Sequence, residues 1–167
     1  MLDRGLDVDH TTIYRWVHSY SKEFDKRVRS YLRETSDSWQ VDETCIKVKG
    51  EWKYLYRAVD SNGNTLDFMF CATQTVNAAK RFLSKVLKSE HNQKARVINV
   101  DKNPAYPIAF NSMVEDNLLP KDCELRQNKY LNNIVEQDHR FIKKLVKPTM
   151  GFKSFHTTRR TLQGMRR

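Results

Sequence analysis

The fold is decided by two stretches, Trp39-Gln-Val-Asp-Glu-Thr-Cys-Ile-Lys-Val48 and Trp52-Lys-Tyr-Leu-Tyr-Arg-Ala-Val59, with Lys49-Gly50 near their junction. Both are rich in β-branched and aromatic residues, which is typical of strands, and the Lys-Gly step predicts a tight turn. A second turn signal, Ser61-Asn-Gly63-Asn, leads into a third strand-like stretch, Thr65-Leu-Asp-Phe-Met-Phe-Cys71. The three stretches predict an antiparallel meander.

Helical and strand-like segments alternate downstream of this meander. Ala95-Arg-Val-Ile-Asn-Val100 predicts a fourth strand, Asn103-Pro104 is typical of a helix start, and Cys123-Glu-Leu-Arg126 fits a short fifth strand. The segment between the third and fourth strands, residues 75–89, predicts a helix with an inward face of Ala78, Ala79, Phe82, Leu83, Val86 and Leu87. This order predicts an α/β fold, with a mixed sheet of three antiparallel strands plus parallel strands, flanked by helices.

A further amphipathic helix is predicted over Tyr130–Val146, where apolar residues recur at helical spacing. Glu136 stands at the border of its apolar stripe. Arg140 and Lys143 follow one and two turns later near the same side. A carboxylate beside a basic track suits a group that holds a metal ion against a phosphate backbone, whereas an isolated glutamate would be an ordinary surface residue.

Two other carboxylates, within or directly after predicted strands, are candidates for a metal-binding site. Asp42 lies mid-strand and shares its face with apolar residues, which is costly unless a cation or hydrogen bonds satisfy it. Asp101 follows the fourth strand, at the end where open α/β sheets place ligands. With Glu136 they make an oxygen-only set suited to magnesium or manganese. Glu43 is expected to point to the opposite face from Asp42 and is left out of this set.

The N-terminal region predicts a short helix over residues 10–20, capped by Asp9. Its polar face resembles the second half of a helix-turn-helix, and the alternative is a small packing helix. The face offers four candidate DNA contacts: His10, Thr11, Thr12 and Arg15. Residues 21–38 are expected to be a linker that is partly helical.

Charge is concentrated at the C-terminus. The net charge is +10, and residues 139–167 carry nine bases and no acid. A basic tail of this kind favours a polyanionic partner, most simply nucleic acid, over a solubilising role. The three cysteines have no CxxC spacing, and no apolar run approaches a membrane span, so a reducing, cytoplasmic setting without membrane contact is expected.

Three motifs carry a family resemblance. They are Val41-Asp42-Glu43-Thr44, Val100-Asp101-Lys-Asn-Pro-Ala-Tyr106 and Asn132-Asn-Ile-Val-Glu136-Gln-Asp-His-Arg140, with 34 residues between the second and third acidic positions. They resemble the catalytic core of bacterial DDE transposases. Trp52-Lys-Tyr-Leu-Tyr-Arg-Ala-Val-Asp60 and Lys147-Pro-Thr-Met-Gly-Phe-Lys-Ser-Phe155 are similar to the insertion-sequence-six family, and the resemblance spans about residues 3–164.

The resemblance implies an RNase H-like fold and metal-dependent DNA nicking followed by strand transfer. Asp42, Asp101 and Glu136 would be both the catalytic and the metal-binding residues, holding Mg²⁺ or Mn²⁺, with two ions expected. The implied partners are the DNA ends of the element and target DNA, bound by a homo-oligomer in the bacterial cytoplasm and nucleoid. The expected C-terminal DNA contacts are Arg140, Lys143, Lys144 and Lys147.

The expected organisation is a partial helix-turn-helix over 1–20, a linker over 21–38, a catalytic domain over 39–147 and a basic segment over 148–167. Members of the family normally begin with further helices, so the chain is expected to be a truncated copy at its N-terminus. The alternative hypothesis is a non-catalytic DNA-binding fragment that interferes with full-length transposase.

Overall fold

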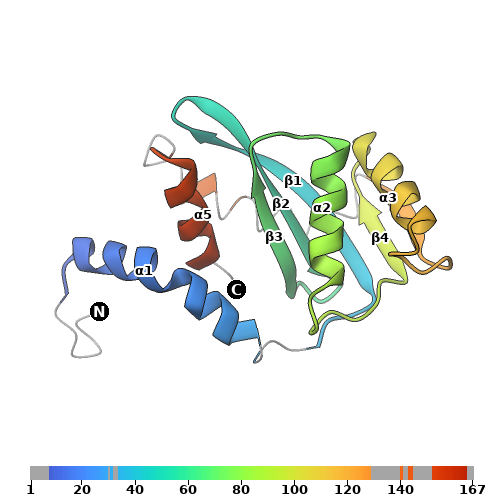
Figure 1. Cartoon of the computed structure of the whole chain (residues 1–167), viewed down its shortest axis with the longest axis horizontal. Coiled ribbons are helices and arrows are strands. Elements are labelled where there is room, and N and C mark those ends of the chain that lie inside the picture. Colours follow the sequence, from blue (N-terminus) through green and yellow to red (C-terminus); the bar gives the residue numbers. More distant parts are fainter. Residues whose placement is uncertain are drawn as a thin grey trace.

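The computed structural model describes residues 8–29, 31, 34–128, 140, 143–144 and 152–164 (Figure 1). Most of the helix predicted over 130–146 lies outside these residues. The elements, in chain order, are α1 (His10–Arg29), β1 (Ser38–Val48), β2 (Glu51–Asp60), β3 (Thr65–Cys71), α2 (Val76–Leu87), β4 (Val97–Val100), α3 (Ala105–Glu115), β5 (Glu124–Gln127) and α5 (Phe155–Gly164).

Five strands of the described chain form one mixed sheet in the order β3-β2-β1-β4-β5. β1, β2 and β3 pair antiparallel, whereas β4 runs parallel to both β1 and β5. The tight turn between β1 and β2 is confirmed, because Lys49 and Gly50 have φ of 50° and 84° and so supply the two left-handed positions of a primed hairpin turn. The predicted meander is confirmed, and β1, which carries Asp42, is the central strand of the sheet.

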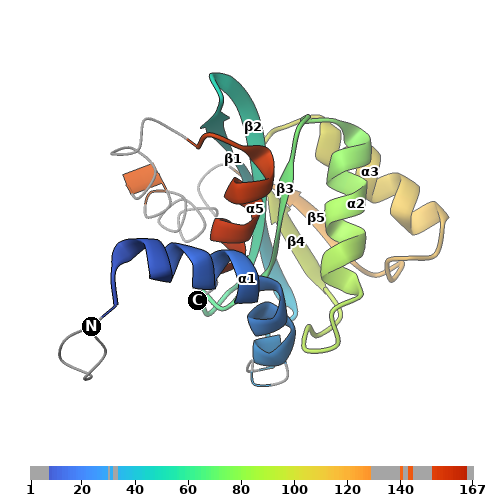
Figure 2. The same ribbon diagram turned by 60° about the vertical axis from the view of Figure 1, so that its left-hand side comes forward.

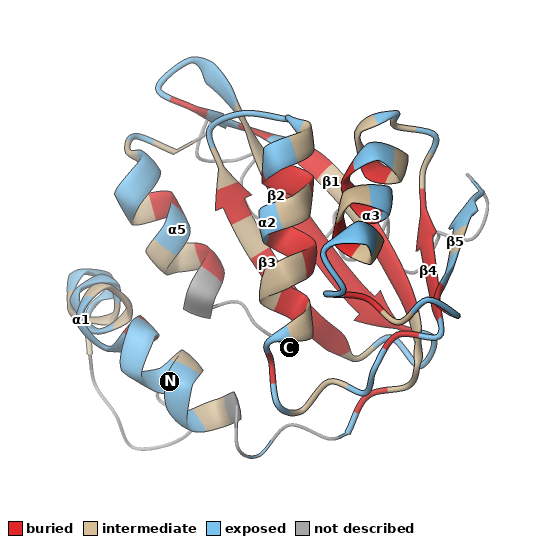
Figure 3. Ribbon diagram, turned by 45° about the vertical axis from the view of Figure 1, so that its right-hand side comes forward, coloured by how far each residue is buried: buried red, intermediate tan, exposed pale blue. Residues whose placement is uncertain are grey.

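The two faces of the sheet have separate cores (Figure 3). α2 and α3 cover the face that holds Trp39 and Val41 of β1, whose side chains are fully buried. The opposite face holds Ile46 and Val48 of β1 and is covered by Leu162 of α5. Successive β1 residues alternate between these cores as a pleated strand requires. The predicted inward face of α2 is confirmed at all its positions, and Leu87, which is half-buried, also packs against this core.

The helix α1 begins where the sequence predicts and ends later. The Asp9 carboxylate accepts the Thr12 backbone N–H at 2.6 Å and therefore caps the helix. The helix then continues to Arg29, so the first half of the predicted linker is helical. α1 packs on α5 (Figure 2). In this contact the Arg160 guanidinium lies 2.6 Å from Nδ1 of His18. None of the helices in the described ranges is long and apolar enough to cross a membrane.

Candidate catalytic centre

Asp42 and Asp101 are brought together by the parallel pairing of β1 and β4. In that pairing Gln40 stands opposite Asn99, so Asp42, within β1, and Asp101, directly after β4, each lie two residues further along neighbouring parallel strands. One carboxylate oxygen from each of Asp42, Glu43 and Asp101 lies within 4.8 Å of the others. The predicted convergence of the first two carboxylates is therefore correct.

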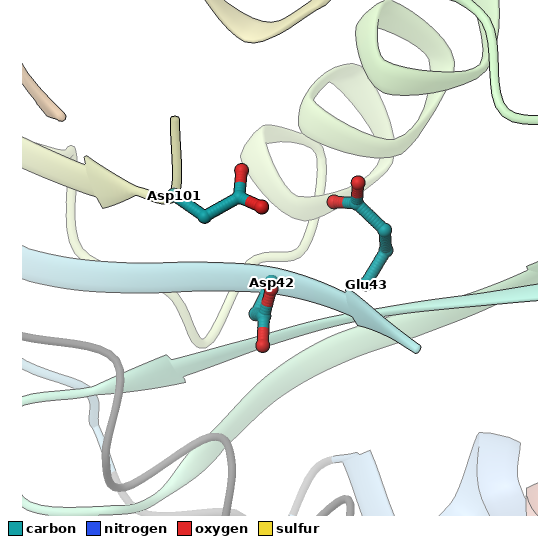
Figure 4. A group of neighbouring side chains, drawn as sticks. All are labelled: Asp42, Glu43 and Asp101. Atoms are coloured by element: carbon teal, nitrogen blue, oxygen red, sulfur yellow. The ribbon is translucent and has the colours of Figure 1, made fainter. Parts of the chain in front are cut away.

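Glu43 is an unpredicted neighbour of these two aspartates. Figure 4 shows the Glu43 and Asp101 carboxylates on one side of β1 in this view and the Asp42 side chain on the other. As expected, Glu43 points to the opposite face of β1 from Asp42. Its side chain is longer, however, and its carboxylate still lies close to those of Asp42 and Asp101. Its Oε1 accepts hydrogen bonds from the Gln74 and Asn103 amides, each at 2.5 Å, and its Oε2 accepts one from the Tyr106 hydroxyl.

These hydrogen bonds tie Glu43 to the segments before α2 and at the start of α3. Asn103 is fixed in turn, since its backbone N–H donates to Asp101 at 2.9 Å and its side chain accepts the Ala105 N–H at 2.9 Å. Asn103 thereby links the Asp101 and Glu43 carboxylates to the segment that leads into α3. The predicted helix start near Asn103-Pro104 is confirmed, since α3 begins at Ala105, with Pro104 at the N-cap and no side-chain cap.

The electrostatics of the group favour a cation. Burial raises the pKa of Glu43 above its ordinary value, although the hydrogen bonds from Tyr106 and Asn103 oppose this. Burial likewise raises the pKa of Asp101, and the nearby charge of Asp42 adds to the effect. Carboxylates crowded in this way are stabilised by a divalent ion, and oxygen-only ligand sets suit magnesium or manganese. The donor set therefore fits the predicted type of metal.

Tyr106→Phe is expected to cost about 1.5–3 kcal/mol of unfolding free energy at pH 7, because a buried charged acceptor loses a hydrogen bond. The hydrogen bond from Tyr106 lowers the pKa of Glu43, so its loss should raise that pKa further. The cost should shrink as the pH falls and Glu43 becomes protonated. Urea unfolding at two pH values measures this, with the exposed Tyr20→Phe as control. A pH-independent cost would contradict a hydrogen bond to ionised Glu43.

The remaining predicted site residues are scattered or lie outside the described residues. Glu136 and Lys147 are outside them. Arg140, Lys143 and Lys144 are helical and exposed. At the start of α1, His10, Thr11 and Arg15 are exposed, and the Thr11 hydroxyl and Thr12 N–H both bond to Asp9, so part of that polar face is used in capping. Figure 1 shows α1 on the side of the molecule away from β4.

Sequence reasoning missed Glu43 because strand alternation alone was used to exclude it. The signal available was the run of hydrogen-bond donors after Asp101. Asn103 and Tyr106 both follow it at the start of a predicted helix, where they face the neighbouring strand. Such donors can hydrogen-bond a glutamate on the face of β1 opposite to Asp42. Pointing away from Asp42 is therefore no reason to exclude Glu43 from the carboxylate group.

A protein family described as a DDE domain matches residues 36–167. The transposase of the insertion sequence-like element IS431mec from Staphylococcus aureus strain Mu50 is 36% identical over 163 residues, which cover 98% of this chain and 70% of that protein. The transposase of the element IS257 in transposon Tn4003, from the same species, is 36% identical over 162 residues, which cover 97% of this chain and 70% of that protein.

Two solved structures share the fold at low sequence identity. The HTLV-2 integrase catalytic core domain in complex with magnesium superposes with a TM-score of 0.54 at 18% identity, covering 71% of this chain and 73% of that one. The Mos1 strand transfer complex gives a TM-score of 0.53 at 11% identity over 96% of this chain and 55% of that one. The predicted RNase H-like architecture, as found in integrase and transposase cores, is confirmed.

Proposed function

Because the chain belongs to the insertion-sequence-six family of DDE transposases, which are polynucleotidyl transferases, we propose that Asp42, Asp101 and Glu136 form its catalytic centre. The observation that carries this proposal is the proximity of the Asp42 carboxylate, within β1, to the Asp101 carboxylate, at the end of the paired strand β4. Glu136 is assigned from its motif and from the 34 residues that separate it from Asp101. Its assignment extends the oxygen-only ligand set without requiring any histidine or cysteine.

The proposed cofactor is a pair of divalent ions, Mg²⁺ or Mn²⁺. Bound there, such ions would activate a water or a 3′-hydroxyl and stabilise the leaving oxygen of a phosphodiester. The chain's own contribution is to hold the carboxylates: Asn103 fixes Asp101 through its backbone N–H, and Tyr106 and Gln74 fix Glu43 beside it. That the HTLV-2 integrase core was solved with magnesium supports this choice of ion.

The proposed substrates are the DNA ends of an insertion sequence and its target DNA, acted on by a homo-oligomer at the bacterial nucleoid. The Mos1 strand transfer complex, which shares the fold, supports this assignment. The proposed DNA contacts in the C-terminal part are Arg140, Lys143, Lys144 and Lys147, the first three of which are exposed. Those in the N-terminal part are His10, Thr11, Thr12 and Arg15, of which Thr11 and Thr12 also serve the helix cap.

A joining assay tests this function. Purified protein is incubated with a pre-cleaved DNA end and a target duplex, in Mg²⁺, in Mn²⁺ or in EDTA, and the joined product is measured. We expect joining with either ion and none in EDTA, because the carboxylates have no other means of activating the attacking oxygen. Retained DNA binding with no joining under any of these conditions would contradict a catalytic role and leave a DNA-binding fragment.

A further inference from the structure

A basic cavity lies along the outer edge of β3, separate from the carboxylate group. Its volume is about 450 Å³, and residues of α1, β3, α2 and α5 line it. The charged side chains in these walls are Arg81 and Lys85 of α2, Lys88 at the C-cap of α2, Arg159 of α5 and Asp25 of α1. The cavity therefore joins residues far apart in the sequence into one charged surface.

The charge of this cavity is only partly balanced. Lys85 donates to the fully buried Asp67 carboxylate at 2.8 Å, so its charge is used within the fold. Arg81, Lys88 and Arg159 are exposed, and none of them makes an ion pair among the residues that the structure describes. Among the described residues that line the cavity, Asp25 is the acidic one. The three exposed basic side chains outnumber this carboxylate, so the cavity carries a net positive charge that attracts anions.

The spacing of these cations suits a polymer of phosphates more than one small anion. Arg81 in α2 and Lys88 at its C-cap are seven residues apart and thus about 10 Å apart along the helix axis. Phosphates of one DNA strand advance about 3.4 Å per nucleotide along the duplex axis, so the two side chains match phosphates roughly three steps apart. Arginine, moreover, offers the paired N–H donors that phosphate oxygens accept.

The position of the cavity relative to Asp42 and Asp101 fits the same duplex. β3 is two strands from β1 and three from β4, which at about 4.8 Å per strand is on the order of 10–14 Å. That distance corresponds to roughly three or four base-pair steps. A duplex with its reacting phosphate at the carboxylates would thus extend its backbone to the cavity.

We propose that the basic cavity, through Arg81, Lys88 and Arg159, binds backbone phosphates of the DNA duplex three or four base pairs from the reacting phosphate. The proposal rests on the proposed function for the location of that phosphate. It adds a DNA contact surface at the β3 edge of the sheet, separate from the contacts proposed at the start of α1 and at residues 140–147. Arg159 is the residue that the basic segment 148–167 contributes to it. The contact reads no base sequence, so it would secure the register of the duplex without selecting its sequence.

The test compares two double variants with the same change in net charge. One is Arg81→Gln with Lys88→Gln. The control is Lys94→Gln with Lys121→Gln, two exposed lysines that lie outside the cavity walls and make no ion pair in the described part of the chain. Binding of a labelled 25-base-pair duplex is measured in EDTA over a series of salt concentrations, with circular dichroism to verify folding. A third variant, Arg159→Gln, tests the contribution of α5 to DNA binding through the same salt dependence of affinity.

The cavity variant is expected to bind more weakly and to lower the slope of log K against log salt by about 0.9 for each phosphate that is no longer neutralised, or about 1.8 for the two side chains together. The control should keep the wild-type slope. Equal slopes for the two double variants would overturn the proposal, because only the total charge would then matter. Joining by the wild type with Mg²⁺ is measured separately. An absence of joining would contradict the transposase function, whereas equal salt slopes would contradict DNA binding by the cavity.

Discussion

Asp101→Asn is expected to reduce metal-dependent DNA joining by about 1,000-fold while leaving DNA binding in EDTA intact or stronger. Losing a metal ligand removes several kcal/mol of charge stabilisation from the transition state, and about 4 kcal/mol corresponds to a factor of 1,000 in rate. Binding should survive because the variant removes a negative charge that repels phosphate when no metal is present. The measurement is the rate of joined product beside a binding isotherm.

The stability of the same variant distinguishes loss of a ligand from loss of the fold. Burial and Asp42 raise the pKa of Asp101 above 3.8, so the folded chain binds this proton more tightly than the unfolded chain. The metal-free wild type should therefore lose stability as the pH rises from near 4 through the raised pKa. Asparagine removes that contribution. In EDTA at pH 7 the variant should unfold at the wild-type temperature or above it.

Matched controls complete this prediction. Asp122→Asn makes the same chemical change at an exposed turn and should leave joining unchanged. Glu136→Gln should resemble Asp101→Asn, with exposed Glu115→Gln as its control. Wild-type joining rates for Asp101→Asn would remove Asp101 from the centre, and wild-type rates for Glu136→Gln would leave the third ligand to be found elsewhere, with Glu43 the nearest described candidate.

Phe82→Ala is expected to lower the unfolding free energy by about 3–5 kcal/mol, the usual cost of truncating a fully buried phenylalanine. Phe82 has no exposed surface and lies on the inner face of α2, with its ring centroid 5.6 Å from that of Tyr56 in β2. Its loss would open a cavity between the helix and the sheet. At roughly 2–4 °C per kcal/mol, the melting temperature should fall by about 6–20 °C.

Ile108→Ala provides the contrasting case. This side chain lies on α3 and is 57% exposed, so its truncation should change the unfolding free energy by no more than about 0.5 kcal/mol. Thermal unfolding followed by circular dichroism measures both variants. Similar losses for Phe82→Ala and Ile108→Ala would contradict the packing of α2 on the sheet, and hence the two-layer arrangement described for that face.

The sheet could be predicted because its signals are local. Turn residues such as Gly50 and Gly63 have φ of +84° and +83°, positions that favour glycine, and buried and exposed residues alternate over the last part of β1, from Thr44 to Val48. Asp42 and Asp101 are both predicted site residues because each is a carboxylate placed within or directly after a strand, and the parallel pairing of β1 with β4 brings them together. These inferences need only backbone geometry, which short sequence patterns largely determine.

Features that depend on side-chain reach or on charge in three dimensions could not be predicted in the same way. Glu43 was excluded on strand alternation, yet one extra methylene and donors such as Asn103 bring it within 4.8 Å of the aspartates. The basic cavity joins Arg81 to Arg159, which are 78 positions apart, and no periodicity in the sequence links them. Glu136 stays a prediction from its motif.

The parallel pairing of β1 and β4 has a consequence for how the protein folds. The meander closes over short turns, whereas the hydrogen bond from Asn99 to the Trp39 carbonyl spans 60 positions. Closing the longer loop costs roughly 2–3 kcal/mol more chain entropy than closing a tight turn. The meander is therefore a scaffold that forms from local contacts, and the two aspartates meet only when β4 docks on it. We therefore expect the carboxylate group to assemble at a late stage of folding, after most of the sheet has formed.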